Sequence, residues 1–82
     1  DTEINLDYGL YTQPKIFELG NKTYISVTDT QAQRVLVFDK NAALLSGFPV
    51  YGNSAIDMRI ENGGNVVLTV KGEEDVVLVY RM

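Results

Sequence analysis

Apolar and polar residues along this chain alternate in short runs, with a period of two residues. Near the start, Ile4, Leu6 and Tyr8 are separated by single polar residues, as in a strand with one buried face. No window longer than one turn has apolar residues at the spacing of a helix. The pattern predicts an all-β, antiparallel protein with eight strands, over residues 4–8, 15–19, 23–28, 35–38, 44–50, 56–60, 66–70 and 76–80.

Turn-forming residues separate these strands. The pair at residues 20–21, Gly-Asn, and the triplet at residues 62–64, Asn-Gly-Gly, tolerate the positive φ angles of tight hairpins. In the turn after residue 38 we expect Asn41 to take a positive φ. Longer polar connections are expected at residues 9–12, 29–33, 51–54 and 72–75.

Two strands have a composition that predicts their place in a sheet. Residues 35–38 are apolar at every position, so we expect this strand to be covered on both faces. Residues 44–50 contain Gly47 and Pro49, and a proline cannot donate a hydrogen bond to a central ladder. We therefore expect residues 44–50 to form an outer, edge strand.

The second half of the chain repeats the first. Residues 23–40 align without a gap with residues 65–82, and the tripeptide Val-Leu-Val occurs at 35–37 and again at 77–79, 42 positions later. A period of about forty residues in an all-strand chain is typical of β-propeller blades. If the strands of a blade are named A to D from the inside outward, the predicted order is D-ABCD-ABC.

This order predicts one domain over residues 1–82, made of two β-propeller-like blades of four strands each. The blade-like repeats cover about residues 14–50 and 56–82, and the strand at residues 4–8 would complete the second of them. Propellers typically contain four to eight blades, so two blades do not close a ring. Three alternatives remain: a fragment of a longer propeller, a ring of two or three copies, or a self-contained sandwich or open barrel of seven or eight strands.

Composition narrows the range of partners. The net charge is −4, and the seven lysines and arginines are scattered along the chain. Nucleic-acid binding requires a positive stripe, so we expect none. No apolar run is long enough for a membrane helix, and we expect no membrane insertion. The absence of cysteine fits any compartment; a periplasmic or secreted location is preferred.

The chain also lacks histidine, which removes several kinds of catalytic site. Neither a Ser-His-Asp nor a Cys-His arrangement is available, and zinc would lack its favoured nitrogen and sulfur ligands. Enzyme chemistry would have to use carboxylates, tyrosines or lysines. We expect no enzyme activity and no cofactor or metal.

Two acidic groups have a functional and a structural interpretation. Glu73, Glu74 and Asp75 are adjacent and could serve as acid and base or ligate calcium. A solvated turn is the preferred interpretation, because neighbours on one turn rarely converge on one point. Asp29 begins the equivalent corner of the first repeat, where it either faces a ligand or caps its own turn.

The longer polar connections are expected on one face of the sheets, because successive antiparallel strands alternate in direction. Loops on a rigid scaffold commonly carry binding sites, and tyrosines near loops stack on sugars or anchor interfaces. Rim packing is the structural alternative for the tyrosines. The candidate ligand-binding residues are Tyr11, Gln13, Asp29, Gln31, Tyr51, Asn53, Glu73 and Glu74.

The segment at residues 38–50, FDKNAALLSGFPV, resembles repeats of bacterial β-propellers of the pyrroloquinoline-quinone-like and FG-GAP-like kind. In those repeats a hydrophobic strand leads into Phe-Asp, an Asn-Gly turn and a Gly-Phe-Pro segment. Here Ala42 stands where such turns usually carry glycine, the calcium loop is missing, and there is no tryptophan. The resemblance covers residues 14–50 well and implies a fold without implying any catalytic residue.

These observations predict a non-catalytic β-propeller segment that acts as a scaffold for binding a protein or a ligand. The start at Asp1 instead of methionine suggests a processed chain or an excised piece. The 42-residue offset and the D-ABCD-ABC order favour the C-terminal part of a longer bacterial protein. An unpaired strand edge is a template for addition, so we expect a protein partner or a homo-oligomer. The alternative is a small, lectin-like, carbohydrate-binding module that assembles by self-association.

Overall fold

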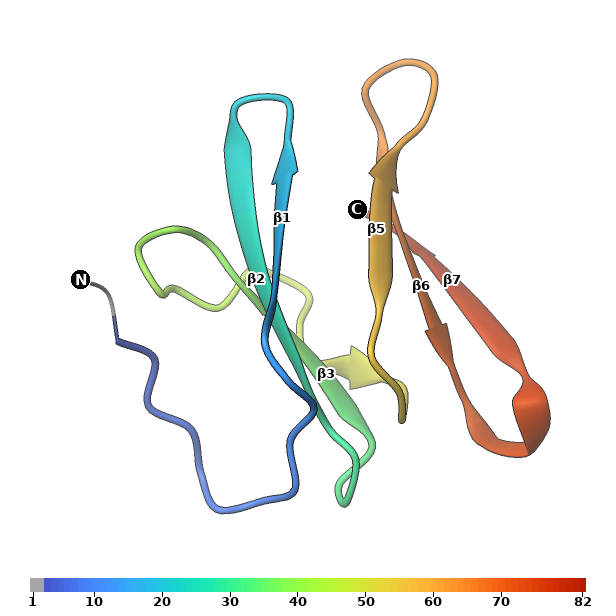
Figure 1. The fold of residues 1–82 in the computed structure, drawn as a ribbon. Helices are drawn as coiled ribbons and strands as arrows, with labels where there is room; N and C mark the ends of the chain where they lie inside the picture. Colours follow the sequence, from blue (N-terminus) through green and yellow to red (C-terminus); the bar gives the residue numbers. More distant parts are fainter. Residues whose placement is uncertain (1–2) are drawn as a thin grey trace.

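The protein is all-β and consists of two antiparallel sheets that face each other. The structure, a computed structural model, describes residues 3–82, so the first two residues of the predicted domain lie outside the described residues. Sheet 1 has the order β1-β2-β3-β4 and sheet 2 the order β5-β6-β7, and β1 lies beside β5 (Figure 1). The two sheets do not close into a barrel. The strands are β1 (Lys15–Leu19), β2 (Lys22–Asp29), β3 (Arg34–Phe38), β4 (Val50–Tyr51), β5 (Asp57–Ile60), β6 (Val66–Lys71) and β7 (Val77–Arg81).

The hairpin turns follow from glycine. Gly20, at φ 64°, lies between β1 and β2, while Gly63 and Gly64, at φ 87° and 81°, lie between β5 and β6. Both turns were predicted from the sequence. In the turn after β3 the prediction was wrong, because Ala42 and not Asn41 takes the positive φ, at 66°. The Asp39 carboxylate fixes this turn by accepting hydrogen bonds from the backbone N–H groups of Asn41 and Ala43.

The predicted strand at residues 44–50 is mostly irregular. Leu44 makes a single bridge to Phe38, and only Val50 and Tyr51 pair with β3. Between these points the chain turns at Gly47, at φ 89°, and Pro49 has no N–H to donate. The outer strand of sheet 1 is therefore two residues long.

The predicted strand at residues 4–8 is not formed. The chain first pairs at Leu10, whose carbonyl accepts a hydrogen bond from Thr30 N–H, and Thr12 N–H then donates to Thr28. These residues extend the β1 side of sheet 1 past Pro14. The segment before them lies on the side of sheet 1 that faces away from sheet 2 (Figure 1). It therefore does not complete sheet 2 within the described chain, where β7 pairs with β6.

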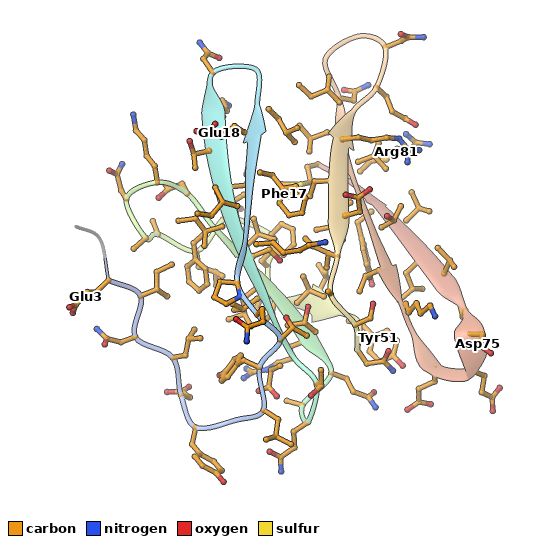
Figure 2. The ribbon with its side chains drawn as sticks, viewed as in Figure 1. Glu3, Phe17, Glu18, Tyr51, Asp75 and Arg81 are labelled. Carbon is orange, nitrogen blue, oxygen red and sulfur yellow. The ribbon has the colours of Figure 1, made fainter. Side chains whose placement is uncertain are left out.

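The core lies between the two sheets. Sheet 1 contributes Tyr24, Val35 and Val37, while sheet 2 contributes Leu68 and Val70. Phe17 points from β1 into the same space, whereas its neighbour Glu18 points to the other side of sheet 1 (Figure 2). Val35, Val37 and Leu68 are fully buried, and each contributes roughly 1.5–3 kcal/mol by leaving water.

The strand at residues 35–38 is covered on both faces, as its composition predicted. Val35 and Val37 face sheet 2, while Phe38 is 7% exposed although it lies on the opposite face of sheet 1. Leu36 is half-buried on that face. β3 is thus an interior strand of sheet 1, between β2 and β4.

The ladder registers show how the two sheets correspond. Leu36 pairs with Val27, but Leu78, 42 residues after Leu36, pairs with Val70. The separation is therefore 42 residues between β1 and β5 and between β3 and β7, but 43 between β2 and β6. The gapless alignment was one residue out of register in β6. There are two causes. The β5–β6 turn, residues 62–64, is one residue longer than the β1–β2 turn, and the β6–β7 corner is one residue shorter than the β2–β3 corner.

This correspondence shows that the sheets pack through different faces. Sheet 2 packs on sheet 1 with the row Met58, Leu68 and Tyr80. The residues of sheet 1 in the same positions are Ile16, Ile25 and Phe38, which form one row across the face turned away from sheet 2. The two sheets therefore contact each other through faces that do not correspond, an arrangement that we call head-to-tail packing. The face that sheet 2 buries is the one that sheet 1 turns outward, and the face that sheet 1 buries is the one that sheet 2 turns outward.

Candidate functional site

The longer connections gather at one end of the two sheets, which we call the long-loop end. It comprises residues 9–13, 30–33, 52–56 and 72–76, which lie at the lower edge of Figure 1. The short turns at residues 20–21 and 62–64 lie at the opposite end. The two corners of the long-loop end touch, because the Gln33 side-chain amide donates a hydrogen bond of 3.1 Å to the Glu73 carboxylate.

Asp29 shapes the corner between β2 and β3. Its carboxylate oxygen Oδ1 accepts hydrogen bonds from the backbone N–H groups of Gln31 (3.1 Å) and Ala32 (3.0 Å), and Oδ2 lies 3.4 Å from the Arg34 guanidinium. The residue is 2% exposed. The hydrogen bond from Ala32 N–H, with further ones from Arg34 and Gln31, lowers the pKa of Asp29 against the opposing effect of desolvation. Asp29 is a turn cap, and both of its oxygens have internal partners.

Tyr11 lies against this corner. It bridges to Asp29 in an antiparallel manner, and its hydroxyl donates a hydrogen bond of 2.8 Å to the Asp7 carbonyl. Its ring is half-buried next to Gly9. Gln13 and Gln31 are exposed on either side. Of this group, the two glutamines present free polar side chains.

Tyr51 and Asn53 lie beside the second corner. The Tyr51 carbonyl accepts a hydrogen bond of 2.8 Å from the Tyr80 hydroxyl, and its ring lies against Gly72 while 41% of the residue remains exposed. The Asn53 amide nitrogen donates to the carbonyls of Lys71 (3.0 Å) and Gly72 (3.2 Å). Tyr51 thus keeps part of its ring open to solvent (Figure 2), whereas Asn53 fastens the link between the sheets to β6.

Glu73, Glu74 and Asp75 form a short turn in which all three residues are exposed. Glu74 and Asp75 have positive φ angles of 57° and 62°, so the turn is not a regular helix. Only Glu73 takes part in a side-chain hydrogen bond, with Gln33, among the residues described. The geometry is that of a solvated turn, and the three groups do not converge on one point.

The predicted site residues therefore form a polar rim with no common pocket. Gln13, Gln31, Tyr51, Glu73 and Glu74 are exposed on this rim, while the side chains of Asp29 and Asn53 make structural hydrogen bonds. None of the eight lines any of the four depressions described below.

The hollows of the surface are lined by residues that the sequence did not indicate. A depression of about 430 Å³ lies between the start of β5 and the end of β6, and Lys15 closes one side of it by donating a hydrogen bond of 2.9 Å to the Ile56 carbonyl. A second, of about 530 Å³, lies at the opposite end beside Tyr24 and Asp39. Two more, of about 420 and 430 Å³, adjoin Ile60. Three of the four join segments that are distant in sequence, so no local pattern reveals them. The depression of about 420 Å³ is lined by Ile60, Glu61 and Asn62 alone.

Charged groups outside the rim form one cluster on sheet 2. Glu61 accepts hydrogen bonds from Arg81 (2.6 Å) and Arg59 (3.2 Å), which lower its pKa. The cluster lies over Val67, which is 1% exposed although it faces away from the core. The long arginine stems thus cover an apolar residue.

Among residues 3–82, no three carboxylate, histidine or cysteine side chains are grouped so as to hold a metal ion. The described part of the chain also contains no helix of the length and apolarity needed to span a membrane. No family model, no curated protein and no solved structure matches this chain.

Proposed function

We propose that this chain is a non-catalytic, β-propeller-like segment that acts as a binding scaffold and contacts a partner protein through its long-loop end. The head-to-tail packing of two meander sheets carries this proposal. Stacking through non-equivalent faces places equivalent corners side by side, so the Gln33–Glu73 contact joins one corner to the next. The result is a continuous polar rim on a rigid support.

The side chains of this rim suit protein recognition better than catalysis. Gln31, Glu73 and Glu74 are exposed and acidic or neutral, and the chain as a whole carries a net charge of −4. Such a rim is complementary to a partner surface with a positive patch, which raises the association rate. Nucleic acid is disfavoured by the same charge.

The proposal is tested by site-specific photocrosslinking. A crosslinker replaces Gln31 or Glu73 at the long-loop end, and matched controls place it at Asn21 or Asn62, which are exposed at the opposite end. We expect the first pair to capture one defined protein from the source cell, with competition by excess unlabelled chain. Equal capture from both ends, or capture of nothing but other copies of this chain, would contradict a partner site on the rim.

A carbohydrate-binding role is the second candidate, and the exposed ring of Tyr51 favours it. Aromatic rings at a polar rim stack on the apolar faces of sugars. Glycan binding that is lost in Tyr51→Ala but kept in Tyr80→Phe would support this role. A folded chain that binds no glycan on an array would remove it.

A further inference from the structure

Identical tripeptides in the two sheets have opposite environments. Val35 and Val37 are fully buried between the sheets, whereas their counterparts in β7, Val77 and Val79, are 62% and 53% exposed. The ladder registers place both pairs on the same face of their own sheets. The outer face of sheet 2 is thus the counterpart of the face of sheet 1 that packs in the core, and it lacks a covering layer within the described chain.

The outer face of sheet 1 presents the matching half. Ile16, Ile25 and Phe38 follow one another across β1, β2 and β3, and Leu44 makes an isolated bridge to Phe38. Ile16 and Leu44, at the two ends of the row, are 68% and 42% exposed, whereas Ile25 is half-buried and Phe38 is 7% exposed within a single copy. In sheet 2 the first three positions of this row are occupied by Met58, Leu68 and Tyr80, the residues that pack on sheet 1.

We propose that the outer face of sheet 2 binds the outer face of sheet 1 of a second copy of this chain, by the same head-to-tail packing that joins the two sheets within one copy. Both sides of the existing interface recur on the surface of the molecule, with Arg59 and Glu61 of sheet 2 at the positions of Phe17 and Leu19. A contact between non-equivalent faces generates either a closed ring or an open filament when it is repeated. The inference rests on the proposed function in one respect: both assume that each sheet packs on the next like a propeller blade.

The charges at this contact are complementary. Glu18 lies on the outer face of sheet 1, and its counterpart in sheet 2 is Ile60. Within one copy, Ile60 lies at the short-turn end of sheet 1, because its Cδ1 is 4.0 Å from the position of a Cβ on Gly20. Glu18 of the second copy would accordingly come to the short-turn end of sheet 2. The Arg59–Glu61–Arg81 cluster lies at that end, and its two arginines and one glutamate leave a net charge of +1.

The same packing gives the segment at residues 4–8 a partner. Val50 of β4 pairs with Val35 of β3. Tyr8 lies 42 positions before Val50, and Val77 lies 42 positions after Val35. In the stacked pair, Tyr8 of the second copy lies opposite Val77, at the outer edge of β7. Tyr8 is 97% exposed within a single copy, and in the stacked pair an alternating apolar segment completes sheet 2.

Light scattering on face variants tests the proposal. Ile16→Lys disables the outer face of sheet 1, and Val79→Glu disables that of sheet 2. We expect a wild-type mass that is a multiple of the 9.1 kDa chain. Each variant should behave as a monomer, with a dissociation constant raised roughly 30-fold or more by the buried charge. The control is Val76→Glu, because Val76 is 51% exposed but precedes β7, and it should assemble like wild type.

Mixing the two variants provides the decisive measurement. Each retains the face that the other has lost, so an equimolar mixture should form a discrete pair of one copy of each and assemble no further. A mixture that stays monomeric overturns the proposal, as does a wild-type chain that is monomeric up to its solubility limit. Assembly that survives Val79→Glu also overturns it, because the contact would then use sheet 1 alone. Circular dichroism verifies that each variant is folded.

This test is independent of the partner site. The two disabling substitutions, at Ile16 and Val79, lie on the sheet faces, whereas the crosslinkers lie on the long-loop end. A failure to self-associate therefore leaves end-specific capture at Gln31 and Glu73 intact, and a failure of capture leaves the mass of the assembly unchanged.

Discussion

Val35 and Val70, which belong to different sheets, flank Gly52 so closely that a Cβ on this glycine would lie 2.8 Å from a γ-carbon of each. The link between the sheets therefore passes through the core at a residue without a side chain. Gly52→Ala should lower the free energy of unfolding by about 1–3 kcal/mol, because the methyl group overpacks the site. Urea denaturation of the two proteins measures this difference.

A second variant checks that the cause is steric. Removal of the γ-carbons in Val70→Ala leaves space for the added methyl group, so the double variant should lose less stability than the sum of the two single variants. Strict additivity would show that Gly52 is required for some other reason.

The turn after β3 should accept a stabilising glycine. Ala42 has a φ of 66°, a conformation that costs a residue with a Cβ about 1–2 kcal/mol. Ala42→Gly should therefore raise the free energy of unfolding by about 1 kcal/mol, after allowance for the more flexible unfolded chain. Ala43→Gly, one residue later and without a positive φ, should lower it. Thermal unfolding of both variants gives the comparison, and equal effects would contradict the strain argument.

Asp29 should make the stability depend on acidic pH. Its pKa is lowered in the folded protein, chiefly by the hydrogen bond from Ala32 N–H, so the unfolded chain takes up the proton more readily. The stabilisation is complete above the ordinary carboxyl range near pH 4 and is lost as the pH falls through the lower folded value.

Urea midpoints at about pH 5 and about pH 2.5 measure this loss. Asp29→Asn cannot titrate, so it should lose less stability over the interval than wild type. Asp57→Asn is the control, because Asp57 is exposed and makes no side-chain hydrogen bond within the described chain. It should follow the wild-type curve. An Asp29→Asn profile that is parallel to wild type would contradict the role of the carboxylate.

Much of the fold is predictable from short stretches of sequence. The strands at residues 15–19, 23–28 and 66–70 and the glycine turns between the hairpin strands follow from alternation and from φ preferences, which act between near neighbours. The polar corners could also be placed at one end, because strand direction alternates. The role of Asp29 as a turn cap was one of two interpretations that the sequence left open.

The sequence-based predictions failed where the local structure depends on residues that are distant in the sequence. Ile4, Leu6 and Tyr8 alternate as in a strand, but a strand requires a neighbouring edge, and within the described chain the edge of β7 lies on the far side of the other sheet. Residues 44–49 have strand-like composition, but Gly47 and Pro49 turn the chain away from β3. The depressions near Lys15 and Tyr24 unite strands that the sequence separates.

The sequence by itself determined that the chain forms two similar meanders with their longer polar corners at a common end, because hydrophobic alternation and turn chemistry are local. Only the tertiary structure decided which face of each meander is buried. Val-Leu-Val occurs in both β3 and β7, yet its valines are buried in the first and exposed in the second. The tripeptides are the same, and the difference lies in the layer that packs against them, since burial is a property of the neighbours that a strand meets in space.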